Sequence, residues 1–264
     1  TTSSYCTALG RVALYYNSTG VSNTAVGTDA LQNNSTGNYN TAVGHDCLDS
    51  NTTGHDNTAV GYNALQANSD AGYCTAIGKE ALKNNNASYN TGVGRDALFT
   101  NTTGVSNTAV GTDALQNNST GDENVAMGHD TLDNNSTGER NTAIGFQALT
   151  AQTTANANTA VGQKAGGSMT TGSDNTLIGV VAGFDMTTGT NNLLLGYSAG
   201  RTSSPSGAIT TSDNAVCLGN NSIQNLYCKV STIQTSDIRD KTDVTDFKHG
   251  LSWVEKLRPI TYRW

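Results

Sequence analysis

A 17-residue repeat is the feature that most constrains the fold of this chain. The motif Asn-Thr-Ala-Val-Gly-x-x-Ala-Leu, followed by a polar Asn/Ser/Thr-Gly turn, recurs over about three quarters of the 264 residues. Stretch 21–37 is identical to stretch 105–121, so the register of the units is unambiguous. Repeats of this length stack on their neighbours to bury a common core, which predicts a solenoid. The motif glycine stands at positions 10, 27, 44, 61, 78, 94, 111, 128, 145, 162, 179 and 196.

The pattern inside a unit favours β-strands over a helix. Thr24 and Val26 alternate with Ala25, the pair 30–31 follows as Ala-Leu, and a Thr-Gly turn closes the unit at 36–37. Glycine and β-branched residues recur in every unit, and no apolar set persists at helical spacing. We therefore predict an all-β fold, a parallel β-solenoid or β-roll of about twelve coils. Each coil would hold two short strands, with Val and Leu columns pointing inward.

The composition indicates that one chain alone buries little apolar surface. Only 35% of the residues are hydrophobic and 6% are aromatic, while 29 are glycine. Each coil would bury about one Val and one Leu yet fix the backbone of 17 residues, which costs conformational entropy. Burial against further chains is therefore expected, and we predict a parallel homotrimeric fibre. At about 4.8 Å per stacked strand, twelve coils would span roughly 55 Å.

Most units place an asparagine four residues before the motif glycine. We interpret these side chains as an inward ladder of amides that caps turn backbone. Cys6 and Cys74 take this place in two units, and Cys47 stands where most other units carry Ala. We predict buried thiols for these three, since Cys6 and Cys74 lie four coils apart and a disulfide needs Cα atoms within about 7 Å. The asparagines are Asn23, Asn40, Asn57, Asn90, Asn107, Asn124, Asn141, Asn158, Asn175 and Asn192.

The chain divides by sequence into three parts. Residues 1–200 form the repeat shaft, and residues 201–235 form a transition β module that opens with a Ser-Pro-Ser-Gly loop. From residue 236 the composition turns charged, and Leu251, Val254 and Leu257 follow at helical spacing before Pro259. We expect residues 236–264 to be the opening of a longer, small α+β domain.

The repeats resemble two known kinds of protein. The Asn-Thr-Ala-Val-Gly-x-x-Ala-Leu arrays are similar to those of bacteriophage tail-fibre proteins and, less closely, to the heads of trimeric autotransporter adhesins. Both resemblances imply parallel β-rolls assembled as homotrimers.

The segment from residue 236 resembles the endosialidase-type intramolecular chaperone domain. Its Ser-Asp-x-Arg-x-Lys hallmark is met by Ser236, Asp237, Arg239 and Lys241. The resemblance implies a trimeric domain that folds the preceding fibre and then cuts the chain before the motif serine, here at the 235–236 bond. Ser236 would be the nucleophile and Lys241 its base, supported by Asp237 and Arg239. On spacing alone, a solvated charged turn formed by Asp237, Arg239 and Lys241 is the favoured interpretation, and the family resemblance reverses that preference.

These features together favour the structural shaft of a phage tail fibre. The resemblance implies a virion protein, made in the bacterial cytoplasm, whose partners are its own copies, other tail or fibre proteins and a host-surface receptor such as a glycan. The net charge of −7 without a basic cluster excludes a nucleic-acid binder, and no stretch approaches the roughly 20 apolar residues of a membrane span. The sequence shows no pair of carboxylates of the kind that an enzyme acting on an external glycan would need, so we expect no such enzyme. We expect no cofactor and no metal, and interpret His45 and His129 as surface residues.

Two other functions remain open. A trimeric bacterial surface adhesin would fit the same repeats, and a downstream membrane-anchor β-barrel would distinguish it from a tail fibre. An ice-binding solenoid would use threonine columns as a flat array, and thermal hysteresis would reveal it. The threonine columns lack the Thr-x-Thr rank that would favour this second alternative.

Overall fold

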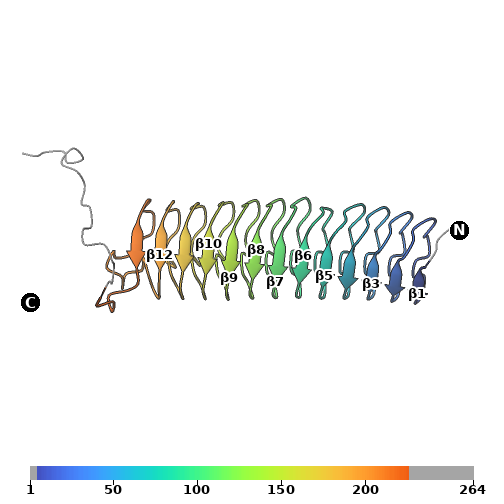
Figure 1. Cartoon of the computed structure of the whole chain (residues 1–264), viewed down its shortest axis with the longest axis horizontal. Helices are drawn as coiled ribbons and strands as arrows, with labels where there is room; N and C mark the ends of the chain where they lie inside the picture. The colour runs from blue at the N-terminus through green and yellow to red at the C-terminus, as the bar shows by residue number, and fades with distance from the viewer. Residues whose placement is uncertain (1–4, 226–264) are drawn as a thin grey trace, which may run out of the picture. The chain divides into compact units, whose positions relative to one another are not determined.

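The computed structural model describes residues 5–225, which form a single β-solenoid (Figure 1). Thirteen three-residue strands make one parallel sheet in sequence order, and each pairs with its neighbours in equivalent register. The predicted all-β solenoid is confirmed. Residues up to Gln224 make one compact unit, and a second unit begins at Asn225. The strands are β1 (Thr7–Leu9), β2 (Thr24–Val26), β3 (Thr41–Val43), β4 (Thr58–Val60), β5 (Thr75–Ile77), β6 (Thr91–Val93), β7 (Thr108–Val110), β8 (Val125–Met127), β9 (Thr142–Ile144), β10 (Thr159–Val161), β11 (Thr176–Ile178), β12 (Leu193–Leu195) and β13 (Val216–Leu218).

Each coil contains one strand, so the prediction of two strands per unit was wrong. The Ala-Leu segment forms a turn in which the leucine has a left-handed backbone, with φ of 49° at Leu31. The inter-coil hydrogen bonds nevertheless continue there, since Leu31 N donates to Cys47 O at 3.0 Å. Period-2 alternation therefore covers only three residues, and the corner that follows bends the chain back toward the next coil.

The valine column faces outward, which contradicts the predicted inward Val column. Only the middle residue of a three-residue strand points into the coil, and in β2 that residue is the fully buried Ala25. The third residue points away from the core, and Val43 is 37% exposed. The interior is narrow, so the small alanine and the predicted inward leucine of the turn fill it together.

The motif glycine is required by close stacking of the coils. At Gly27, φ is +139° and a Cβ would lie 2.3 Å from the carbonyl oxygen of Gly44 in the next coil. A side chain there would collide with backbone, which cannot move without breaking the ladder. The same contact recurs from coil to coil along the shaft.

The core changes its packing near the C-terminal end. In eight coils a buried strand residue, usually alanine, packs with a leucine in the turn. From residue 166 the turn position is Gly166, Gly183 or Gly200. Leucine instead occupies the inward strand position, as Leu177 and Leu194, both fully buried. A Cβ on Gly166 would lie 2.7 Å from Leu177 Cδ1, so the leucine fills the space that a turn side chain would need. In these coils the large apolar side chain stands on the strand and no longer in the turn, and the core remains filled.

This exchange predicts a specific coupling between two core substitutions. Leu177→Ala should destabilise by about 2–5 kcal/mol because it leaves a cavity, and Gly166→Leu should destabilise because of the clash with Leu177. The double variant should cost less than the sum of the single variants, since it shifts the packing junction by one coil. Denaturant unfolding of the four proteins measures the coupling. Additive effects would contradict the exchange.

Candidate functional site

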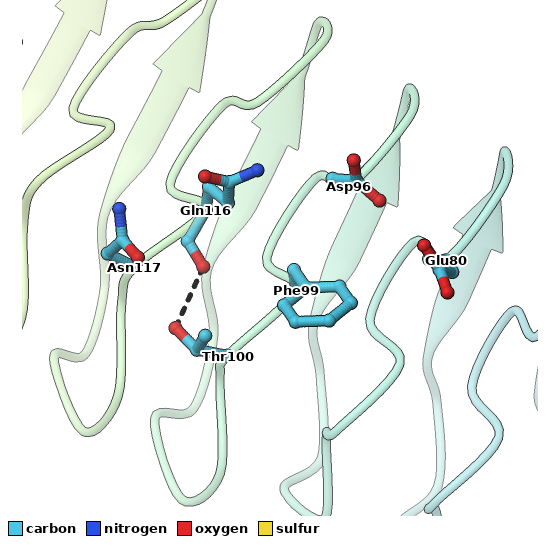
Figure 2. Close-up of a pocket in the computed structure, with 6 residues that line it drawn as sticks. All are labelled: Glu80, Asp96, Phe99, Thr100, Gln116 and Asn117. Carbon is cyan, nitrogen blue, oxygen red and sulfur yellow. Dashed lines mark hydrogen bonds between the residues drawn. The ribbon is translucent and has the colours of Figure 1, made fainter.

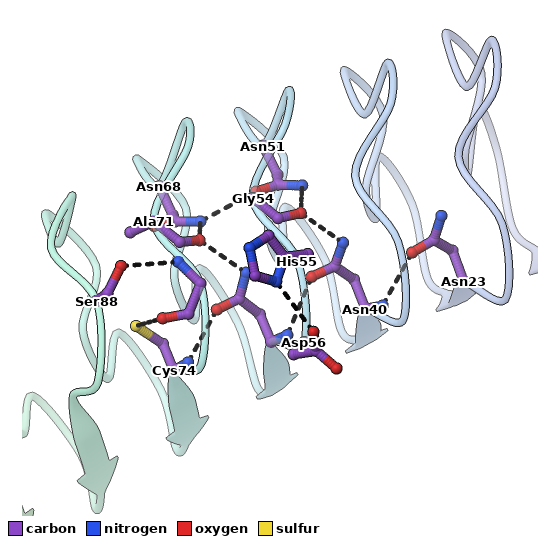
Figure 3. A network of polar contacts seen from close by, with 12 residues as sticks. Asn23, Asn40, Asn51, Gly54, His55, Asp56, Asn68, Ala71, Cys74 and Ser88 are labelled. Atoms are coloured by element: carbon purple, nitrogen blue, oxygen red, sulfur yellow. Dashed lines mark hydrogen bonds and ion pairs between the residues drawn. The ribbon is translucent and has the colours of Figure 1, made fainter.

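Two ladders of buried amides connect the coils (Figure 3). The first ladder is formed by the asparagines that the sequence pattern singled out. The backbone N–H of Asn40 donates to Asn23 Oδ1 at 2.9 Å, and Asn40 Nδ2 donates to Gly54 O at 2.8 Å. Each side-chain amide thus accepts a hydrogen bond from a backbone N–H of the coil that follows. It also donates a hydrogen bond to a turn carbonyl of that coil. The equivalent residues Asn57, Asn107, Asn124, Asn141, Asn158 and Asn175 are buried and make the corresponding bonds.

A second ladder runs beside the first and was missed in the sequence. Asn51 Nδ2 donates to Asn34 Oδ1 at 2.8 Å and to Gly54 O at 3.0 Å. Gly54 O therefore accepts from both ladders, which satisfies both of its lone pairs. An asparagine recurring seven residues after the motif glycine was the available signal. The ladder positions are Asn17, Asn34, Asn51, Asn68, Asn85, Asn101, Asn118, Asn135 and Gln152, after which Met169 and Met186 take the place. The ladder is interrupted once, because Asn85 Nδ2 donates to Ala87 O and leaves Asn68 Oδ1 without a partner.

The cysteines act as small polar core residues. Cys74 replaces a ladder asparagine: its N–H donates to Asn57 Oδ1 at 3.0 Å and its Sγ to Ala87 O at 3.2 Å. Cys47 donates from Sγ to Ala59 O at 3.1 Å, and burial raises the pKa of its thiol to about 12. Both are buried free thiols, as predicted, whereas Cys6 is half-buried. The thiols of Cys47 and Cys74, whose pKa burial raises, therefore remain protonated and unreactive in the folded coil.

The outer face of the sheet carries two columns of side chains. The first residue of each strand is threonine in ten coils, and the third residue is always apolar. The third-residue column, here called the apolar column, is half-buried or exposed throughout. It has no charged member in the thirteen strands, and it comprises Leu9, Val26, Val43, Val60, Ile77, Val93, Val110, Met127, Ile144, Val161, Ile178, Leu195 and Leu218.

Charged residues flank this face at the turn after the motif glycine. Arg11 pairs with Asp29 at 2.9 Å, and Arg95 pairs with Asp113 at 2.6 Å, each joining adjacent coils. His45 is exposed there and its Nδ1 lies 2.9 Å from Asp46 Oδ2. Asp29, His45 and Asp46 each have one side-chain atom able to bind a metal ion, and these three atoms lie within 4.8 Å of one another. Asp113, His129 and Asp130 repeat the arrangement. These groups form the ionic rim of the apolar column.

An open hollow spans the coils that contain β5, β6 and β7 (Figure 2). It has a volume of about 260 Å³ and is lined by Glu80, Asp96, Phe99, Thr100, Gln116 and Asn117. A hydrogen bond from Lys83 lowers the pKa of Glu80 to about 2, whereas burial raises the pKa of Asp96. Asp96 is also paired with Arg95. Both carboxylates thus have basic partners, and the hollow belongs to the ionic rim.

The predicted self-cleavage residues Ser236, Asp237, Arg239 and Lys241 lie outside the described residues. Their roles stay a prediction. The expected helix before Pro259 lies there as well.

One comparison with known proteins gives a match in the C-terminal segment. Residues 236–264 match the model of a family described as the chaperone of endosialidase. No curated protein and no solved structure matches the chain. Within residues 5–225 no helix is long and apolar enough to cross a membrane. The chain thus combines a β-solenoid with a segment that matches an intramolecular chaperone.

The ladder predicts graded effects at Asn107. Asn107→Ala should destabilise by about 1–3 kcal/mol, because the buried N–H of Asn124 loses its acceptor. Asn107→Cys should cost less, since a thiol can still donate to Gly121 O as Cys74 does to Ala87 O. Thermal unfolding is the measurement, and Asn117→Ala on the exposed turn is the control. Equal effects of all three substitutions would contradict the ladder's role.

Proposed function

We propose that this chain is the shaft of a phage tail fibre, assembled as a parallel homotrimer and folded by a C-terminal chaperone that then releases itself. One observation carries the proposal: a regular β-solenoid with a continuous apolar column precedes a segment that matches the chaperone of endosialidase. A solenoid alone would fit many functions. The chaperone match narrows them, because such a domain serves proteins whose fibres do not assemble unaided.

The apolar column supports assembly through the outer face of the sheet. A column that repeats one apolar side chain per coil needs a partner with the same spacing over thirteen coils. A second copy of this chain, parallel and in register, has that spacing throughout. Three columns that meet on an axis bury each other, and the ionic rims stay in water.

Two substitutions in one coil test this assembly. Light scattering of the purified protein should give three times the chain mass of 27.4 kDa. Val110→Asp should abolish the trimer, because it would bury three carboxylates near one axis. It should leave the solenoid of each chain folded, since Val110 points outward and is half-buried. Thr120→Asp, on an exposed turn of the same coil, should remain trimeric.

A wild-type protein that is monomeric and folded would refute the trimer. A Val110→Asp protein that remains trimeric would show that the copies meet through another face.

The chaperone segment offers a chemical route to release. The Ser236 hydroxyl attacks the carbonyl carbon of Thr235 while Lys241 takes the hydroxyl proton and passes it to the leaving amide nitrogen. The C–N bond breaks, the Thr235 carbonyl is held as an ester on Ser236, and water then hydrolyses that ester. A neutral lysine is needed, which burial in an assembled domain would provide. Cleavage would therefore follow assembly.

Mass spectrometry of the complete protein tests the release. We expect cleavage between residues 235 and 236, with a rate that does not depend on dilution once trimers exist. Ser236→Ala and Lys241→Ala should each leave an uncut trimer, whereas Ser231→Ala and Lys248→Ala should cut normally. An intact chain in assembled wild-type fibres, or cleavage that survives both active substitutions, would remove the proposed pair of catalytic residues.

On this proposal the fibre belongs to the virion and is made in the bacterial cytoplasm. It would contact other tail or fibre proteins and a host-surface receptor, with a glycan as one candidate class. Labelling of intact virions with an antibody raised against the repeats would test this location.

A further inference from the structure

The outer face of the sheet changes its chemistry at the last two strands. The first strand position is threonine in ten of thirteen coils, but it is Leu193 in β12 and Val216 in β13. The two residues are paired in register, as are Leu195 and Leu218 in the apolar column. Both outward positions are therefore apolar in two successive coils. We call Leu193, Leu195, Val216 and Leu218 the terminal patch.

The terminal patch has no role in the core of its own coil. The inward positions of β12 and β13 are filled by Leu194 and Cys217, both buried. In contrast, Val216 is 68% exposed and Leu193 is 36% exposed. A shallow groove of about 370 Å³ runs along this edge and is lined by Thr176, Leu193 and Val216 together with Asn191 and Asn214. The patch is thus an uncovered apolar surface next to a concavity.

We propose that the terminal patch is where three copies of this chain first associate, with the same patch of the other two copies as its occupant. The proposal rests on the trimer proposed above. The position of the patch supports this occupant: strand β13 ends at residue 218, and the segment that matches a chaperone begins at residue 236. Chains gathered by that segment would bring their terminal patches together before any other coil.

The Thr-to-Leu change explains why association would start there. On an isolated chain a threonine hydroxyl keeps a hydrogen bond to water, so exposure of the threonine column costs little free energy. Leucine and valine at the same place gain free energy only when they are covered. The terminal patch thus offers two apolar positions per coil, against one in most of the shaft. Once it is closed, the single apolar column can align coil by coil toward β1, because the register is already set.

Substitution by the residue that other coils use tests the proposal without altering the core. Leu193→Thr/Val216→Thr restores the common residue at both positions in the complete chain. The control is Val125→Thr, the same change in the middle of the shaft, where β8 carries the remaining exception. Each protein is unfolded in guanidinium and refolded by dilution, and trimer formation is followed by light scattering. Circular dichroism of the same samples reports the solenoid.

We expect the double variant to form trimers at least about tenfold more slowly than wild type, and Val125→Thr to match wild type within about twofold. Equal rates for all three proteins would overturn the inference while leaving the trimer intact. A wild-type protein that never forms trimers would instead refute the proposed function.

A second measurement does not depend on refolding of the double variant. Oxidation of assembled Val216→Cys protein should link two copies by a disulfide, whereas Thr188→Cys on an exposed turn should not. Absence of a link at residue 216 in a confirmed trimer would overturn the inference.

Discussion

The stacking of one coil directly on the next is the constraint on which the rest of the structure depends. Coils stack so closely that a Cβ on the motif glycine would touch the next backbone. In most coils the interior holds one small strand residue, one turn leucine and planar amides. Turn carbonyls that water cannot reach must accept hydrogen bonds from donors inside the core, and the side-chain amides are those donors. Gly54 O, which accepts from Asn40 and Asn51, shows how two ladders satisfy one carbonyl.

The short strands direct other apolar side chains outward. Because only the middle residue of a three-residue strand points into the coil, the valine and isoleucine at the third position lie on the surface of the sheet. A monomer would leave this column half-buried or exposed over its whole length, which is unusual for a soluble chain. The solenoid therefore stabilises itself through hydrogen-bonded ladders and a thin core, while its apolar column remains available for other copies. The chaperone match at residues 236–264 supports this division between folding and assembly.

Much of the fold was predictable from the sequence, because the period of the repeat sets the coil and its register. The strand count per coil was predicted wrongly because alternation cannot continue through a corner, and Leu31 adopts a left-handed conformation that leucine rarely takes. The direction of Val26 was predicted wrongly because alternation does not fix which face is inward, and the small Ala25 fills the narrow interior. The second amide ladder could have been predicted from the repeated asparagines such as Asn34 and Asn51. It was missed because the turns contain many other asparagine residues. The roles of Ser236 and Lys241 came from resemblance, because both residues lie outside the described part of the chain.

Oxidation of the three methionines tests the central claim that the apolar column is buried in the assembled fibre. Met127 lies in the column and is 43% exposed on a single chain, whereas Met169 and Met186 are fully buried in the core. Brief peroxide treatment of the assembled protein, followed by peptide mass spectrometry, compares all three sites in one sample. Slow oxidation of Met127, close to that of the two core methionines, is the predicted result. Fast oxidation of Met127 while Met169 and Met186 stay protected would show that the outer face of the sheet is open to water, and would contradict the account.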